Sequence, residues 1–151
     1  MKIKSSAFEN CEHIPKEHTC DGYSFSPPLE IGDVPEGAKS LVLIVDDPDA
    51  VGGIFTHWLV WNIKPDTEEF RKNHVPEGVV VGVNSEGKNN YVGPCPPSGT
   101  HVYLFKLYAI DMLLPIDPNL GKKKIREMIE GHIIEKTILK GYYERYNGTN
   151  F

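Results

Sequence analysis

The stretch Tyr91-Val-Gly-Pro-Cys-Pro-Pro-Ser-Gly-Thr-His-Val-Tyr103 decides how the rest of the chain is interpreted. Three prolines and two glycines fall within residues 93–99, which excludes a helix because each proline fixes φ and lacks an N–H group. From His101 to Ile110 the side chains follow the two-residue period of a strand. A stiff loop is therefore expected to lead into a strand, with His101 and Tyr103 on one face at its start.

Apolar runs on either side of this stretch predict the other strands. Ser40–Val45 is continuously apolar, which is typical of a strand buried on both faces, and the aromatic and β-branched run Thr56–Ile63 predicts the next strand. Shorter strands are expected at residues 3–8, 29–31 and 78–83, and a closing strand at residues 137–146. The sum is one mostly-β domain spanning residues 1–151.

One helix is expected near the C-terminus. Apolar side chains recur at helical spacing from Lys122 to about Ile134, which predicts an amphipathic helix. Asp117 and Asn119 are the candidate N-cap residues. The lysines at residues 122–124 are expected to form a solvated face.

Composition disfavours several classes of partner. The 151-residue chain carries a net charge of −5, whereas nucleic-acid binders and proteins of acidic membrane surfaces carry basic surfaces. Its longest apolar run, Leu41–Val45, is far too short to span a membrane, and no apolar signal segment opens the chain, so a cytoplasmic location is expected. Asn147-Gly-Thr149 matches a glycosylation acceptor, which without a secretion signal we attribute to chance.

The cysteines and arginines set two further limits. The chain has three cysteines, Cys11, Cys20 and Cys95, and such a small, odd number argues against a secreted disulfide framework. Cys11 and Cys20 could still pair. None of the three arginines lies in a loop that resembles a site. An anion site in this chain must therefore act without a bidentate arginine.

Five polar side chains are expected to gather at one end of the sheet. Asp47 and Asp49 follow a buried strand, His57 opens the next, and His101 and Tyr103 open the strand after the central loop. Such a set suits a pocket in which imidazoles, a phenol and loop N–H groups bind an anion. The alternative without function is that the aspartates cap a turn and the histidines are structural.

Two catalytic alternatives have weaker support. Aspartate and histidine are sound ligands for zinc or iron, but their spacing matches no metal-binding motif. Ser98 or Cys95 could act as a nucleophile with a histidine base, yet the chain has no Gly-x-Ser-x-Gly elbow. We therefore expect neither a bound metal nor a cofactor.

Taken together, these motifs resemble the phosphatidylethanolamine-binding protein family, also called the Raf kinase inhibitor protein family. The resemblance rests on four segments that follow the family's order over nearly the whole chain. They are Cys20-Asp21-Gly22 with Ser26-Pro27-Pro28-Leu29, Asp46-Asp47-Pro48-Asp49-Ala50 with His57-Trp58 and Asn62, residues 93–103, and Glu130-Gly131-His132. The short length and the form Gly-Pro-Cys-Pro-Pro resemble the bacterial and archaeal branch of the family.

The resemblance implies a fold and a site. The implied fold is an antiparallel two-sheet β-sandwich with a helix near the C-terminus, and the implied site is a small pocket for phosphate or similar anions. Carried over by position, the residues of that pocket are Asp47, Asp49, His57, Gly93, Cys95, Pro96, His101 and Tyr103. The family's pattern differs here at Val51, Phe55 and Val102, which weakens any claim to one particular head group.

The resulting expectation is a non-enzymatic binding protein for phosphate, phosphoethanolamine-like head groups or related anions. A desolvated carboxyl at the pocket can stay protonated and donate to the anion, and protonated His57 and His101 would attract it. Binding should therefore strengthen as the pH falls from about 8 to about 6. The alternative is a regulator that inhibits a serine protease or a kinase through surface loops such as residues 10–24 or 68–77. A homodimer is compatible with the resemblance.

Overall fold

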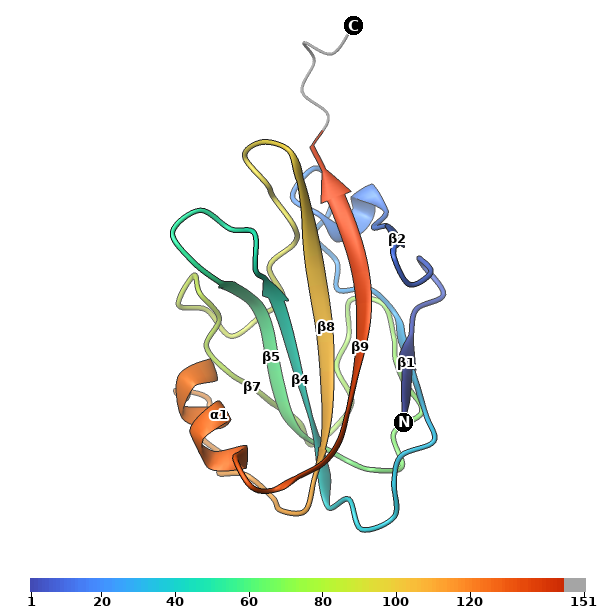
Figure 1. The fold of residues 1–151 in the computed structure, drawn as a ribbon, viewed down its shortest axis with the longest axis vertical. Helices are drawn as coiled ribbons and strands as arrows, with labels where there is room; N and C mark the ends of the chain where they lie inside the picture. Colours follow the sequence, from blue (N-terminus) through green and yellow to red (C-terminus); the bar gives the residue numbers. More distant parts are fainter. Residues whose placement is uncertain (146–151) are drawn as a thin grey trace, which may run out of the picture.

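The computed structural model describes residues 1–145, which form two β-sheets and one α-helix (Figure 1). The larger sheet has the strand order β2 (Glu12–His13), β9 (Ile133–Glu144), β8 (Thr100–Ile110), β4 (Ser40–Asp47), β5 (Phe55–Ile63) and β7 (Val80–Val81). The smaller sheet has the order β1 (Lys2–Lys4), β3 (Leu29–Gly32) and β6 (Glu69–Phe70). The helix α1 spans Lys122–Ile129, and a single 3-10 turn, η1, spans Lys16–His18.

Strand β4 is buried on both faces, as its continuous apolar run predicts. Leu41, Leu43 and Val45 pack into the core shared with the smaller sheet, together with Trp58 and Phe105. The alternate residues of β4 instead belong to a second core on the helix side of the sheet, whose members include Val42, Ile44, Leu59, Trp61, Ile125 and Ile129. The larger sheet is therefore the middle layer, with the small sheet on one face and α1 on the other.

The expectation of purely antiparallel sheets is wrong at one edge. Strand β2 runs parallel to β9, with Glu12 opposite Gly141. Around this short segment, Cys11 donates its N–H to the Lys140 carbonyl and Ile14 donates to the Tyr142 carbonyl, both at 2.8 Å. The segment covers part of an edge that would otherwise expose unpaired backbone groups.

The helix ends one turn earlier than its apolar pattern predicts. Gly131 adopts φ of +82°, a left-handed conformation that stops helices, and β9 begins at Ile133. The N-cap residue is Gly121 and not Asp117 or Asn119. The predicted strands at residues 3–8 and 78–83 are also shorter in the structure. Tyr146 and the Asn147-Gly-Thr149 sequence lie outside the described residues.

Candidate functional site

Three strands of the larger sheet bring polar side chains to one end of the molecule. Strand β4 ends at Asp47, while its antiparallel neighbours β5 and β8 begin at Phe55 and Thr100, so these ends coincide at the top of Figure 1. A cavity of about 280 Å³ lies here. Six of the eight predicted site residues line it, namely Asp47, His57, Gly93, Cys95, Pro96 and His101.

Asp47 and His101 form a buried pair across β4 and β8. His101 Nδ1 lies 2.7 Å from Asp47 Oδ2, and the other carboxylate oxygen accepts the Asp49 backbone N–H at 2.8 Å. A carboxylate with both oxygens engaged fixes the imidazole ring in one orientation and leaves Nε2 as its remaining polar atom. Asp47 therefore orients His101, and the role of a carboxyl that donates to the anion stays a prediction.

His57 is held in the same way by a different acceptor. Its Nδ1 lies 2.6 Å from the Val92 carbonyl oxygen, which can only accept, so Nδ1 carries the proton and Nε2 is left for the cavity. The side chain is buried, and burial lowers the pKa of His57 below its usual value despite the raising effect of the Val92 carbonyl and of Asp47. His57 is consequently a neutral imidazole at neutral pH.

The Tyr103 ring packs against both imidazoles, of His57 and His101, and does not itself line the cavity. Its ring meets His57 edge-on at a centroid distance of 5.3 Å and is roughly parallel to His101 at 6.4 Å. Within residues 1–145 its buried hydroxyl has no hydrogen-bond partner. Burial, reinforced by Asp47 and Asp49, raises the pKa of Tyr103, so the phenol stays protonated and keeps a hydrogen to donate.

Asp49, the eighth predicted residue, is not part of the cavity wall. It is exposed, and its Oδ2 accepts the backbone N–H of Val102 at 2.9 Å. Asp49 thus ties the loop after β4 to the start of β8, and the local turn contact that the alternative without function expects is instead made by Asp47, whose Oδ1 accepts the Asp49 N–H.

Six further wall residues have no counterpart in the predicted set, among them Phe55, Val51 and Glu86. Phe55 packs against His57 at 4.7 Å between ring centroids, Val51 is largely exposed at the cavity, and Glu86 contributes a second carboxylate. Glu86 comes from a polar loop whose sequence gives no signal of a site. The alternation of β5 places Phe55 and His57 on one face, which is the signal that could have identified Phe55.

A disulfide joins the cavity wall to the N-terminal loop. Cys20 pairs with Cys95 across 75 residues, with a Cα separation of 5.4 Å, and Cys11 is free and exposed. The pairing of Cys11 with Cys20 that the sequence left open is therefore wrong. Beside this link, the Cys20 N–H donates to the Pro94 carbonyl at 3.1 Å.

Gly93 is packed so closely that it admits no side chain. A Cβ atom on Gly93 would lie 2.8 Å from Ser24 Oγ and 2.9 Å from the Thr19 backbone. We therefore expect Gly93→Ala to lower the free energy of unfolding by about 1–3 kcal/mol, measured by urea denaturation. Gly32→Ala is the control, because no atom lies within 4 Å of the Cβ added there. Equal urea midpoints for the two variants would contradict the packing described for Gly93.

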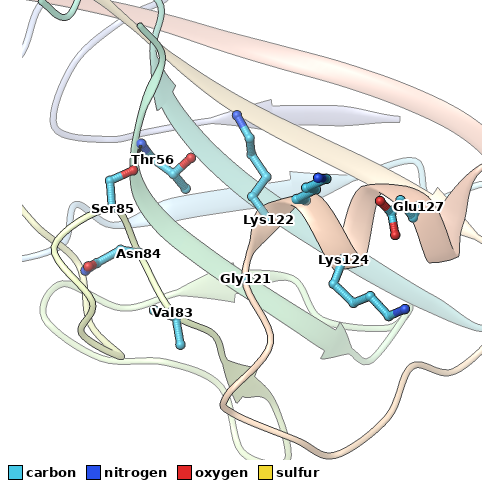
Figure 2. A pocket seen from close by; sticks show the side chains of 9 residues that line it. Thr56, Val83, Asn84, Ser85, Gly121, Lys122, Lys124 and Glu127 are labelled. Carbon is cyan, nitrogen blue, oxygen red and sulfur yellow. Dashed lines mark hydrogen bonds between the residues drawn. The ribbon is translucent and has the colours of Figure 1, made fainter. Parts of the chain in front are cut away.

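A second, wider hollow of about 580 Å³ lies at the start of α1. Figure 2 shows Lys122 and Lys124 leaving the helix in different directions, so their ammonium groups do not converge. Lys122 Nζ is also engaged, 3.1 Å from Oδ2 of the buried Asp46. Among residues 1–145 no group of three or more metal-ligating side chains could hold a metal ion in either hollow.

The comparison with protein families decides the classification. The pattern of the phosphatidylethanolamine-binding protein family matches residues 4–144. The chain belongs to this family. No helix among the described residues of this phosphatidylethanolamine-binding protein family member is long and apolar enough to cross a membrane.

Family relatives match the chain along almost its full length. The UPF0098 protein of Methanothermobacter thermautotrophicus is 45% identical over 150 residues, covering 96% of this chain and 99% of the relative. The phosphatidylethanolamine-binding protein homologue CT736 of Chlamydia trachomatis has a solved structure that superimposes with a TM-score of 0.91 at 39% identity, covering 95% and 97% of the two chains. The structure of E. coli YbcL gives a TM-score of 0.89 at 30% identity, covering 96% and 98%.

Proposed function

We propose that this protein is a non-enzymatic binding protein for small anions of the phosphate or phosphate-monoester type. The observation that carries the proposal is the pair of imidazoles in one cavity wall. Each has its Nδ1 anchored to a fixed acceptor, Val92 for His57 and Asp47 for His101, which leaves Nε2 of each as the polar atom available to a ligand. Two such nitrogens, when protonated, are donors suited to phosphate oxygens.

The cavity wall also sets an upper limit on affinity. It contains two carboxylates, Asp47 and Glu86, and neither lysine nor arginine. A doubly charged anion is therefore bound by hydrogen bonds and by protonation of the histidines, without a permanent positive charge. We expect micromolar to millimolar dissociation constants for free phosphate, roughly 4–8 kcal/mol of binding free energy.

Calorimetric titration with phosphate and with phosphoethanolamine, with a chelator present, tests this proposal. Saturable binding with one anion per chain is the expected result, and the ratio of the two affinities gives the head-group preference. Absence of saturable binding to both anions would refute the proposal.

The pH dependence of binding follows from the state of His57. Because burial lowers the pKa of His57, its protonation in the free protein begins below the usual histidine range, and an anion draws it upward. Affinity should rise as the pH falls from about 8 to about 6 and continue to rise below, by at most about tenfold per pH unit for each proton taken up. Titration with sulfate, which stays dianionic over this range, isolates the protein's protons. An affinity for sulfate that is flat from about pH 8 to about pH 5 would contradict this mechanism.

A second candidate function is inhibition of a serine protease or a kinase by a surface loop. The observation that favours it is the exposure of two large apolar side chains in the loop beside the cavity, 88% for Val51 and 60% for Ile54. Inhibition assays on chymotrypsin-like proteases separate the two candidates. Substitution of His57 or Tyr103 should abolish anion binding and leave loop-based inhibition unchanged, whereas Ile54→Ser, which lies outside the cavity wall, should do the reverse.

The remaining parts of the proposal concern cellular context. With a net charge of −5, the protein is proposed to bind neither nucleic acid nor membrane and to act in the cytoplasm. A homodimer is compatible with this proposal.

A further inference from the structure

We propose that the Cys20–Cys95 disulfide is a reducible site, and that its reduction by a dithiol loosens the cavity wall and weakens anion binding. The inference about affinity rests on the proposed anion-binding function. The inference about the wall rests on the structure alone, so the two can fail separately.

The disulfide is placed where a reductant can reach it and where its loss affects the cavity. Cys95 is exposed and lines the cavity, and Cys20 is only partly buried. Cys11, the remaining cysteine, is exposed in the loop before β2 and is not part of the cavity wall. A dithiol acting on the folded protein therefore has one bond to break.

Apart from the packing of the buried Pro96, the wall beside Cys95 has few attachments other than this bond. Among the described residues, the main chain from Cys95 to Gly99 makes no hydrogen bond, and the prolines within it have no N–H to offer. On the N-terminal side, Val92 makes two hydrogen bonds with His57, one through its N–H and one through its carbonyl oxygen. The Pro94 carbonyl accepts the N–H of Cys20. On the C-terminal side the wall is fastened only where β8 begins at Thr100.

The N-terminal loop forms the other half of this junction. Gly93 rests on the Thr19 backbone, and the Tyr91 hydroxyl donates to the His18 carbonyl at 2.7 Å. These contacts are made by residues that precede Cys95, so we expect residues 91–94 to stay in place after the disulfide is reduced. The segment from Cys95 to Gly99 loses its cross-link to the N-terminal loop, and Cys95 is no longer held at the cavity by that bond.

The reaction is thiol–disulfide exchange with a dithiol as the reductant. One thiolate of the dithiol attacks a sulfur of the Cys20–Cys95 bond, which breaks that bond and forms a mixed disulfide. The second thiolate of the reductant then attacks the reductant's own sulfur in the mixed disulfide. The second protein cysteine leaves as a thiolate, and the reductant closes into an intramolecular disulfide. The protein gains two electrons and two protons and keeps both cysteines as thiols, and the dithiol is oxidised.

Reduction should cost affinity because the anion must then order the wall on binding. We expect the dissociation constant for phosphate to rise about fivefold or more. This factor corresponds to the free-energy cost of ordering the backbone of one residue. We expect the folded core to persist, because both hydrophobic cores lie outside this loop.

The experiment compares oxidised and dithiothreitol-reduced protein carrying Cys11→Ser, so that every thiol detected comes from the one disulfide. Thiol titration, calorimetry with inorganic phosphate and nitrogen-15 relaxation of the backbone amides of residues 91–103 are measured on each form. The expected results are two new thiols, affinity for phosphate lowered about fivefold or more and restored by reoxidation, and lower backbone order parameters at Cys95, Ser98 and Gly99. Order parameters in β4 and β8 should not change. The double variant Cys20→Ser/Cys95→Ser should match the reduced form.

Three outcomes would overturn the proposal. They are a disulfide that resists dithiothreitol in the folded protein, unchanged order parameters at Cys95, Ser98 and Gly99 after reduction, and equal phosphate affinity in both forms. If the oxidised protein does not bind phosphate at all, the proposed function fails, and the order parameters alone still decide whether the disulfide controls the wall.

Discussion

Asp46→Asn is expected to lower the free energy of unfolding by about 3–5 kcal/mol at neutral pH. Asp46 is 1% exposed, and its Oδ2 lies 2.7 Å from Lys106 Nζ and 3.1 Å from Lys122 Nζ. Its other oxygen accepts the hydroxyl of Thr56 at 2.8 Å. An asparagine retains the volume but leaves the buried ammonium of Lys106 without a counter-charge, and that uncompensated charge is the source of the loss.

Urea denaturation of two further variants identifies the cause. Asp46→Asn/Lys106→Met removes both charges and should recover a large part of the lost stability, because an apolar replacement of a buried pair is often close to neutral. Lys2→Met breaks a pair with Asp33 in which both side chains are more than two-thirds exposed, and it should change stability by less than about 1 kcal/mol. A double variant as unstable as Asp46→Asn alone would show that the charge on Lys106 is not the cause.

The same pair makes stability depend on pH in a defined direction. Burial alone would raise the pKa of Asp46, but the hydrogen bond and charge of Lys106, with Thr56 and Lys122, hold it below its ordinary value of 3.8. The stabilisation is therefore present above pH 3.8 and is lost as the pH falls through the lower pKa of the folded state. The difference in free energy of unfolding between the wild type and Asp46→Asn should therefore become smaller in acid.

His57→Asn is expected to weaken phosphate binding by roughly 10- to 100-fold with little change in stability. An asparagine amide can still donate to the Val92 carbonyl in place of Nδ1, whereas nothing replaces Nε2 at the cavity. Calorimetry at about pH 6 measures the loss. His74→Ala is the matched control, because His74 is exposed and lies outside the cavity wall. Equal losses in the two variants, or none in His57→Asn, would contradict the proposed role of His57.

Much of the fold follows from local sequence patterns. Because every residue of Leu41–Val45 is apolar, a strand formed by this run must be buried on both faces. The structure places this strand between two hydrophobic cores. The helix was harder to bound, because Ile133 continues the helical spacing but lies in β9 after Gly131. A periodic pattern does not distinguish one more helical turn from the first residues of a strand.

The candidate site was predictable in its residues but not in its contacts. The strand that ends at Asp47 and the strand that begins beside His101 are both marked by their apolar side chains, so we expected these two residues to meet at one end of the sheet. The partner of Cys95 depends on how a loop 75 residues away is folded back, which no local pattern encodes. The same holds for the position of Glu86, for the contact of Asp47 with His101 and for the hydrogen bond that Asp49 accepts from the Val102 N–H. That these residues bind an anion stays a prediction.

The central claim is tested most directly by nitrogen-15 NMR of the six histidine side chains during titration with phosphate. Without ligand, His57 should carry its proton on Nδ1. With phosphate, the Nε2 signals of His57 and His101 should shift saturably at the anion concentration that calorimetry gives, and those of the exposed His13, His74 and His132 should not. Unchanged signals from His57 and His101, with shifts at the amides of Lys122–Lys124 instead, would place the anion in the second hollow and contradict the account.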